Sequence, residues 1–338
     1  MRPLRHATLE FVELPVIDIN VLRHDPSGVA ARAVGAQIDA ACRNFGFFAI
    51  TGHGVDGDLA LRLDEAAREF FALPDDTKAE IAMRHGGRAW RGWFPLHGEL
   101  TSGRPDQKEG IYFGSELSEP DPRVLAGLPL HGANLFPQHP QSLKPLVLEW
   151  LDVMTQLAHT VLCGMALGLG LEPQWFAEHL TQDPTVLFRI FRYPPAPPDT
   201  WGVQTHTDYG LLTLLVQDDC GGLQVRVGGE WIDVAGGRDT IICNLGDMLD
   251  RMTTGRYRST PHRVRNTTNR ERISLPFFFD PSWNAEVAAI PFNDPPPHDD
   301  RDSRWDGTSL RHLSGTYGEY LTAKIAKVFP ELGGDVLT

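Results

Sequence analysis

The spacing of apolar residues in the first half of the chain predicts three amphipathic helices and two strands. Apolar side chains recur every three or four positions, as on one face of a helix, in the segments Val34–Phe45, Leu59–Phe70 and Lys144 to about Leu169. Gly46 and Pro74 limit the first two helices, and a proline in the first turn favours the start of the third. The short β-branched runs Leu14–Ile19 and Phe47–Thr51 predict strands.

The second half changes to short segments rich in β-branched and aromatic residues, which predict strands. These segments are Val186–Tyr193, Leu211–Val216, Leu223–Val227, Thr240–Leu245, Pro261–Asn266 and Ile273–Phe279. The pair Gly228-Gly229 predicts a tight hairpin turn after the third of them. Many short strands joined by glycine-rich turns favour a closed β architecture such as a jelly roll. One more helix is expected at Tyr317–Val328.

The fold class expected from this order is mainly β with flanking α-helices. Residues 1–140 form the N-terminal helical and loop region, in which Arg88–Pro140 is dense in Gly, Pro and aromatic residues and predicts long loops with short strands. Residues 185–285 form the β core. Because no flexible linker separates the two regions, the sequence predicts a single domain over residues 1–338.

The charge of the chain restricts its partners. With 31 Lys and Arg against 44 Asp and Glu, the formal net charge is −13. This balance disfavours nucleic acid, whose binding depends on clustered cations, and also an anionic membrane surface. The first residues lack the apolar run of a secretory signal, and Val161–Leu171 is too short to span a bilayer. We therefore expect a cytoplasmic protein with no nucleic acid or membrane partner; its oligomeric state is not addressed by the sequence.

The four cysteines contain no C-x-x-C pair. Such wide spacing predicts free thiols rather than a disulfide framework or a structural zinc site.

A candidate metal centre consists of His206, Asp208 and His262. The first two residues are separated by one position just before a predicted strand, and the third opens another strand of the β core. Alone, an H-x-D pair is weak evidence, and a second one, His298-Asp299-Asp300, lies in a Pro-rich loop with no strand to fix it. Two imidazoles and one carboxylate, however, are the facial triad of non-haem Fe(II), which leaves positions open for a cosubstrate and O₂.

A candidate carboxylate anchor follows ten residues after His262. Arg272 and Ser274 are two residues apart in a predicted strand, so their side chains point to the same face. A guanidinium offers a planar fork to a carboxylate, and a hydroxyl adds one more donor. A dicarboxylate could therefore bind the metal at one end and this pair at the other.

These residues resemble the isopenicillin N synthase-like family of 2-oxoglutarate/Fe(II)-dependent dioxygenases. The H-T-D, S-T-P-H-R-V and R-I-S segments look like its metal and cosubstrate motifs, and the likeness continues in LPVIDI and in C-R-N-F-G-F-F near the N-terminus. The resemblance implies a distorted double-stranded β-helix (jelly roll) and the cofactors Fe(II), 2-oxoglutarate and O₂. It also places Tyr193 at the far carboxylate of 2-oxoglutarate. Plant-type members have Asn where this chain has Phe191.

By this resemblance, the reaction converts 2-oxoglutarate and O₂ to succinate and CO₂ while a small-molecule substrate is oxidised. Hydroxylation is the default outcome, with desaturation or ring closure as alternatives. Candidate substrate contacts are Phe279, Phe94, Tyr209 and Arg192, the last for an anionic substrate. Each could instead be structural, as a core aromatic or a charge on the strand surface.

Two other functions stay open at the level of sequence. Some relatives with the same Arg and Ser are Fe(II) oxidases that do not consume 2-oxoglutarate. A non-catalytic binding protein on a jelly-roll scaffold is the second alternative, because a fold does not by itself fix a function.

Overall fold

The computed structural model describes residues 13–290 apart from residues 102, 198 and 236, together with residue 309 and residues 314–328. Its strands are β1 (Val16–Asp18), β2 (Phe47–Thr51), β3 (Gly92–Phe94), β4 (Leu100–Thr101), β5 (Arg104–Pro105), β6 (Glu109–Gly114), β7 (Pro184–Tyr193), β8 (Val203–His206), β9 (Leu212–Gln217), β10 (Leu223–Val227), β11 (Glu230–Val234), β12 (Gly237–Leu245), β13 (His262–Val264) and β14 (Arg272–Ser282). Its α-helices are α1 (Asn20–His24), α2 (Val29–Asn44), α3 (Gly57–Phe71), α4 (Asp75–Lys78), α5 (Pro122–Leu125), α6 (Leu143–Gly168), α7 (Trp175–His179), α8 (Asp247–Met252) and α9 (Tyr317–Val328).

Two β-sheets form the centre of the molecule. The larger sheet has the strand order β1-β2-β12-β9-β14-β7-β6-β3, and the smaller has the order β11-β10-β13-β8. Apart from the parallel pair β1–β2, the pairings within both sheets are antiparallel. This arrangement, together with its flanking helices, is the predicted distorted double-stranded β-helix.

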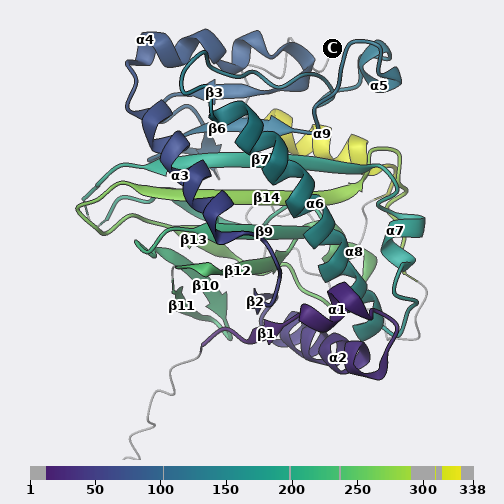
Figure 1. Cartoon of the computed structure of the whole chain (residues 1–338). Helices are drawn as coiled ribbons and strands as arrows, with labels where there is room; N and C mark the ends of the chain where they lie inside the picture. Colours follow the sequence, from purple (N-terminus) through teal and green to yellow (C-terminus); the bar gives the residue numbers. More distant parts are fainter. Residues whose placement is uncertain are drawn as a thin grey trace, which may run out of the picture.

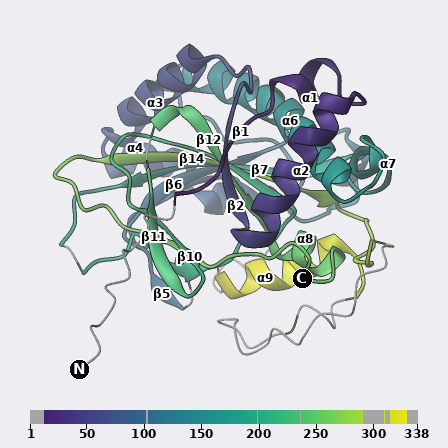
Figure 2. The ribbon, with the colours of Figure 1, turned by 90° about the horizontal axis from the view of Figure 1, so that it is seen from below.

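Helices cover the outer face of the larger sheet. The long helix α6 crosses strands β7, β9 and β14, with α2 and α3 packed beside it (Figure 1). Viewed from below, α9 and the smaller sheet lie on the other side of the larger sheet (Figure 2). The larger sheet is therefore the middle layer, and its inner face looks toward the smaller sheet.

The N-terminal region is built into both edges of the larger sheet. β2 pairs with β12 at one edge, and β6 pairs with β7 at the other. Apolar side chains of the helical region and the β core form one continuous buried cluster. This continuity agrees with the expectation that no linker divides the chain, while the single domain over the whole of 1–338 stays a prediction.

Most elements follow the predicted hydrophobic pattern. β2, β10 and α9 have the predicted bounds, and α6 begins one residue before Lys144. In the hairpin, Val227 pairs with Glu230 around the two glycines, both at positive φ. Five short helices among the described residues, α1, α4, α5, α7 and α8, were not predicted, because so few turns leave no periodic pattern to recognise.

Strand β8 was not predicted from the sequence. His206 is the last residue of strand β8, whereas the sequence indicated only a position before the next strand. The strand is short and largely polar, so its hydrophobic pattern is weak. The second H-x-D pair, His298-Asp299-Asp300, and the loop around it lie outside the described residues.

Helix α6 is long and apolar enough in composition to cross a membrane. More than half of its most apolar window, 56%, is buried within the structure, where the helix packs on α2, α3 and the larger sheet. A core helix of this kind meets the same length and composition criteria, so the expectation of no membrane partner stays a prediction. All four cysteines are free thiols, as predicted.

Gly46 connects the end of α2 to β2 and packs against the segment that leads into β13. Its φ is +66°, and a Cβ there would lie 2.3 Å from Thr260 Oγ1 and 2.4 Å from the carbonyl oxygen of Arg258. Thr260 in turn donates a hydrogen bond to the carbonyl of Phe45. This close approach fixes the position of the chain two residues before His262.

We expect Gly46→Ala to lower the free energy of unfolding by about 2 kcal/mol or more, because a side chain is strained at this φ and would also clash with residues 258–260. Gly57→Ala is the matched control, since a Cβ added there would meet no atom within 4 Å. Denaturant unfolding of the two variants measures the difference. Equal midpoints would show that Gly46 is not a constraint.

Candidate active site

A cavity of about 260 Å³ lies between the two sheets. The larger sheet lines it through alternate residues of β7 and β14, and the smaller sheet contributes residues of β8, β10 and β13; α9 adds Leu321 and Ile325. Because successive side chains of a strand point to opposite faces, only one parity of each strand can reach this cavity. On β14 these are Arg272, Ser274, Pro276, Phe278 and Asp280; on β7 they are Leu187, Arg189, Phe191 and Tyr193.

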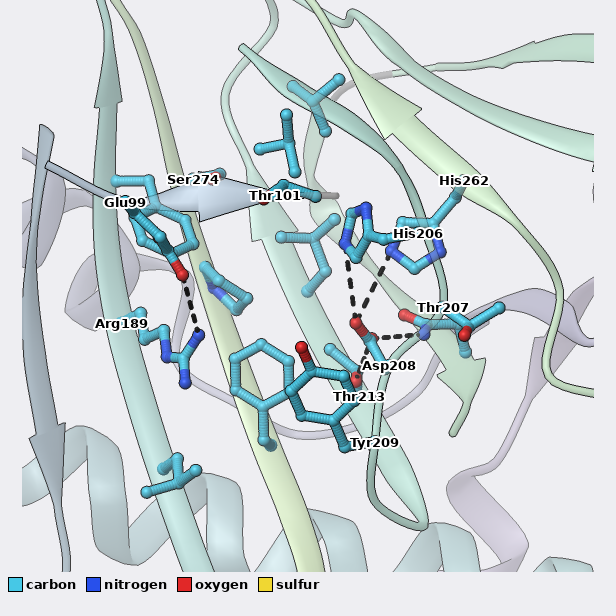
Figure 3. Close-up of a pocket in the computed structure, with 18 of the residues that line it drawn as sticks. Glu99, Thr101, Arg189, His206, Thr207, Asp208, Tyr209, Thr213, His262 and Ser274 are labelled. Atoms are coloured by element: carbon cyan, nitrogen blue, oxygen red, sulfur yellow. Dashed lines mark hydrogen bonds and ion pairs between the residues drawn. The ribbon is translucent and has the colours of Figure 1, made fainter. Parts of the chain in front are cut away.

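His206, Asp208 and His262 converge at one side of this cavity (Figure 3). The Nε2 atoms of His206 and His262 lie 3.8 Å and 3.7 Å from Oδ1 of Asp208. One ligand atom from each of the three residues lies within 4.8 Å of the others. His206 and His262 come together because β8 and β13 pair with these two residues in register. The predicted triad is therefore brought together from adjacent strands.

Each imidazole of the triad is oriented by a backbone carbonyl. Nδ1 of His206 lies 2.8 Å from the carbonyl oxygen of Gln204, and Nδ1 of His262 lies 3.2 Å from that of Thr260. A hydrogen bond from Nδ1–H leaves the lone pair on Nε2, the nitrogen that faces Asp208. This tautomer is the one that presents Nε2 to a metal.

The carboxylate of Asp208 has one oxygen occupied and one directed at the imidazoles. Oδ2 accepts hydrogen bonds from Thr213 Oγ1 at 2.5 Å and from Asn244 Nδ2 at 2.6 Å. Burial alone would raise the pKa of Asp208, but the two imidazoles and these hydrogen bonds hold it below its usual range. Burial and the neighbouring His262 lower the pKa of His206 to about 3. A neutral imidazole and an ionised carboxylate are the forms that bind a metal.

Arg272 is fully buried, yet one of its donors is unused. Its Nε donates to the carbonyl of Gly221 at 2.6 Å and its Nη2 to Gln217 Oε1 at 2.7 Å. Nη1 is buried without a hydrogen-bond partner among the described residues. A buried, unsatisfied charged donor costs free energy unless a ligand completes it. Arg272 thus fits the far carboxylate of 2-oxoglutarate.

Ser274 and Tyr193 line the same end of the cavity as Arg272. Tyr193 is opposite Arg272 in the β7–β14 register, and its ring lies 4.7 Å from the guanidinium carbon. Phe191 also lines the cavity, where Lys108 Nζ lies 4.6 Å from its ring centroid. Plant-type members have asparagine at position 191, whereas this chain has the aromatic ring of Phe191 at the cavity.

Two of the predicted substrate contacts are wrong. Phe279 and Arg192 have the opposite parity to the cavity-lining residues of their strands. Phe279 is fully buried against His159 of α6, with ring centroids 4.8 Å apart. Arg192 forms ion pairs with Glu109 and Glu271 on the outer face of β7. In their place, Phe278 and Arg189 face the cavity.

Of the other two predicted substrate contacts, Tyr209 lines the cavity and Phe94 does not. Tyr209 lines the cavity next to the metal cluster, and burial raises the pKa of its phenol. Phe94 is buried and packs edge-on to Tyr112 and Phe191, with ring centroids 5.3 Å and 6.3 Å apart. Phe94 therefore supports the cavity wall through Phe191 and is not among the lining residues.

Sequence reasoning missed a charged cluster at the cavity. Lys108 Nζ lies 2.9 Å from Glu99 Oε2 and 2.6 Å from Asp106 Oδ2. Arg189 lies across from the triad and reaches Glu99 Oε1 at 3.9 Å (Figure 3). Because alternate residues of a strand share a face, Arg189 could have been predicted from its position four residues before Tyr193. The loop residues Glu99 and Asp106 carry no periodic signal.

Comparisons with known proteins agree with this geometry. Residues 14–139 match the model of the non-haem dioxygenase N-terminal region, named for morphine synthesis, and residues 184–281 match the 2OG-Fe(II) oxygenase superfamily. A probable iron/ascorbate oxidoreductase of Dictyostelium discoideum is 42% identical over 361 residues, which cover 99% of each chain. The chain belongs to the 2OG-Fe(II) oxygenase superfamily.

Further relatives of this oxygenase have more specific names. A homoarginine-6-hydroxylase of Arabidopsis thaliana is 37% identical, with 83% of this chain and 88% of the relative covered. A 1-aminocyclopropane-1-carboxylate oxidase of Dictyostelium mucoroides is 34% identical, with 96% and 97% covered. The crystal structure of a full-length Neurospora crassa protein in complex with alpha-KG shares the fold, with a TM-score of 0.77, 23% identity, and 95% and 98% covered.

This oxygenase is therefore a 2-oxoglutarate-dependent dioxygenase that uses Fe(II), 2-oxoglutarate and O₂. The donor set of the triad suits Fe(II), and the unpaired Nη1 of Arg272 suits a carboxylate. Both groups fit the residues that line this cavity.

Asp280 joins the cavity wall to the C-terminal helix α9. It accepts hydrogen bonds from the Tyr317 hydroxyl and from the backbone N–H of Leu211. Burial raises its pKa to about 7, although these hydrogen bonds act in the opposite direction.

Because the fold favours protonated Asp280, its contribution to stability is full below the unfolded-state pKa of about 4. That contribution is lost as the pH rises towards 7. Asparagine does not titrate, so we expect Asp280→Asn to lack this loss. The free energy of unfolding of the variant minus that of the native protein should therefore increase by a few kcal/mol between pH 5 and 8, because each unit of pKa shift corresponds to about 1.4 kcal/mol. Urea unfolding at several pH values measures it. Asp76→Asn, at an exposed site, controls for loss of a charge; a flat difference for Asp280→Asn contradicts the assignment.

Proposed function

We propose that this oxygenase oxidises a small molecule at an Fe(II) ion held by His206, Asp208 and His262. The proposal depends on one observation: the polar atoms of the triad fall into two groups, one hydrogen-bonded to the protein and one left to face a metal. The outer atoms, two Nδ1 and one Oδ2, have hydrogen-bond partners in the protein, while two Nε2 and one Oδ1 face one another. Ligands held in this way are preorganised for a metal.

Arg272, Ser274 and Tyr193 are proposed to bind the far carboxylate of 2-oxoglutarate. The guanidinium supplies the free Nη1, and the serine hydroxyl lies two residues along the same strand face. Arg272 and Ser274 would hold one end of 2-oxoglutarate, and the metal held by the triad would bind the other. Fe(II), 2-oxoglutarate and O₂ together would supply the oxidising chemistry, with O₂ as the oxidant, and the protein supplies orientation and a cavity with mostly apolar walls.

The substrate is proposed to be small. The cavity of about 260 Å³ must hold the cosubstrate and the substrate together, whereas single ligand pockets commonly measure about 300–1,000 Å³. The named relatives act on homoarginine or 1-aminocyclopropane-1-carboxylate, which are small metabolites, and hydroxylation is the default outcome. No nucleic acid or membrane partner is proposed, and we expect the protein in the cytoplasm.

One alternative calls for a direct test, because a 34% identical relative is named 1-aminocyclopropane-1-carboxylate oxidase. Oxidases of this fold that do not consume 2-oxoglutarate would oxidise substrate without forming succinate. Succinate formed in step with oxidised substrate supports the proposed function. Product formation without succinate favours the alternative.

Anaerobic addition of Fe(II) and 2-oxoglutarate should produce a weak visible metal-to-ligand charge-transfer band. Arg272→Met should raise the 2-oxoglutarate concentration needed for half of this band by at least about tenfold, because a hydrogen-bonded charge is lost. Arg270→Met is the matched control, since its side chain is 63% exposed and pairs with Asp219. Absence of the band in the native protein at saturating 2-oxoglutarate would contradict the proposal.

Thr213→Val should weaken Fe(II) binding about tenfold to a hundredfold, the range found when a residue that supports a metal ligand is lost. The change leaves Asp208 with Asn244 as its hydrogen-bond donor. Thr185→Val is the matched control, because the buried hydroxyl of Thr185 has no partner among the described residues. Competition titration with a metal-binding dye gives both affinities, and equal affinities would exclude a supporting role for Thr213.

A further inference from the structure

Arg189 places a second guanidinium in the cavity, away from the first. Both arginines lie on the inner face of the larger sheet, but Arg272 is opposite Tyr193, whereas Arg189 precedes Tyr193 by four residues on β7. At about 3.3 Å per residue, this separation is about 13 Å along the strand. A 2-oxoglutarate molecule that reaches from Arg272 to the triad therefore does not satisfy Arg189.

The guanidinium of Arg189 is held between two aromatic rings. Its central carbon lies 3.9 Å from the ring centroid of Tyr112 and 4.8 Å from that of Phe278. Stacking on its faces fixes the plane of the group and leaves its N–H donors directed outward from the edge. This preorganised edge lies at the cavity, across from the metal cluster (Figure 3).

The donors of Arg189 are largely unused. Among the described residues its side chain makes no hydrogen bond, and its Nε is buried without a partner. Its ion pair with Glu99 spans 3.9 Å, beyond hydrogen-bond length. Glu99 is instead held by Lys108 at 2.9 Å and by the Tyr112 hydroxyl at 2.5 Å. Burial disfavours the charged form of Arg189, but Tyr112 and Glu99 raise its pKa, so the group is charged and its donors remain available to a ligand.

A further cation lies behind Arg189. The side chain of Arg91 is buried, and its pKa is lowered to about 9 by burial and by the charge of Arg189. Asp106 is in contact with Lys108 at 2.6 Å, so it does not compensate Arg189 directly. Arg91 adds positive charge near this edge, and Arg189 is a cation that lines the cavity with N–H donors that make no hydrogen bond among the described residues.

From these observations we infer that Arg189 binds a carboxylate of the primary substrate. A planar fork with free donors matches a carboxylate in two-point geometry. The inference deepens the proposed function and rests on it, because it takes Arg272 to be occupied by 2-oxoglutarate. It narrows the substrate class to small carboxylic acids, α-amino acids included, whose reacting carbon lies between Arg189 and the metal.

The test measures binding of acids and of their matched uncharged forms. Anaerobic protein with Fe(II) and saturating 2-oxoglutarate is titrated calorimetrically with a panel of carboxylic acids no larger than 2-oxoglutarate, each compared with its primary amide. We expect at least one acid to bind the native protein about tenfold or more tightly than its amide, because a charged hydrogen-bond acceptor is lost in the amide. Arg189→Met, which keeps an unbranched stem between the rings, should abolish this preference and leave 2-oxoglutarate binding unchanged.

Arg192→Met is the matched control. It removes the same charge from the same strand, but on the outer face, and should keep the preference for acids. Should Arg189→Met fail to fold, Arg189→Lys gives the second measurement, because it keeps the charge but loses the fork. We expect that variant to reduce the preference by at least about threefold.

The outcomes separate this inference from the proposed function. Acid binding that survives Arg189→Met, or no acid preferred over its amide by the native protein, would overturn the assignment. Acid binding that is lost with Arg272→Met but not with Arg189→Met would place the acid in the cosubstrate site and also overturn it. If 2-oxoglutarate does not bind the native protein, the proposed function fails, and the acid–amide comparison with Arg189→Met still decides the role of Arg189.

Discussion

The buried carboxylate of Asp208 connects the two sheets, and the geometry of the site depends on how its charge is satisfied. An ionised carboxylate removed from water must be compensated by hydrogen bonds and opposite charge. Thr213 of β9 and Asn244 of β12 bind one oxygen from the larger sheet. The other oxygen faces the histidines of the smaller sheet. A change in the spacing of the sheets would break one set of contacts, so the same carboxylate orients the triad and sets the width of the cavity.

The part of the site that could be predicted from sequence is the part encoded by short spacings. His206 and Asp208 are two residues apart, and Arg272 and Ser274 share a strand face. The remote His262 was chosen because it opens another predicted strand of the β core, but no local pattern can show that β13 pairs with β8. Strand pairing over such separations is decided by the packing of the whole chain, beyond the reach of a local window.

The errors at Phe279 and Arg192 have a common physical origin. Phe279 was chosen from the family resemblance and Arg192 for its charge, in both cases without applying the two-residue alternation of a strand. Counting from Arg272 leads to Phe278, and counting from Tyr193 leads to Arg189. Glu99 and Lys108 could not be found in this way, because the loops that bring them to the cavity have no periodic pattern, and the position of α9 over the cavity is a tertiary contact.

The two ends of the cavity differ in how strongly the surrounding backbone is held in place. Near Arg272 and the triad, Arg272, Ser274, Tyr193 and His262 lie on central strands paired on both sides, and His206 lies on β8, which pairs with β13. Around Arg189, the facing wall comes from the two-stranded β4–β5 segment and from α9. Loops and terminal helices tolerate substitution better than central strands. The cofactor end can therefore keep its chemistry while the wall that faces the substrate changes, which is how one fold accommodates different substrates.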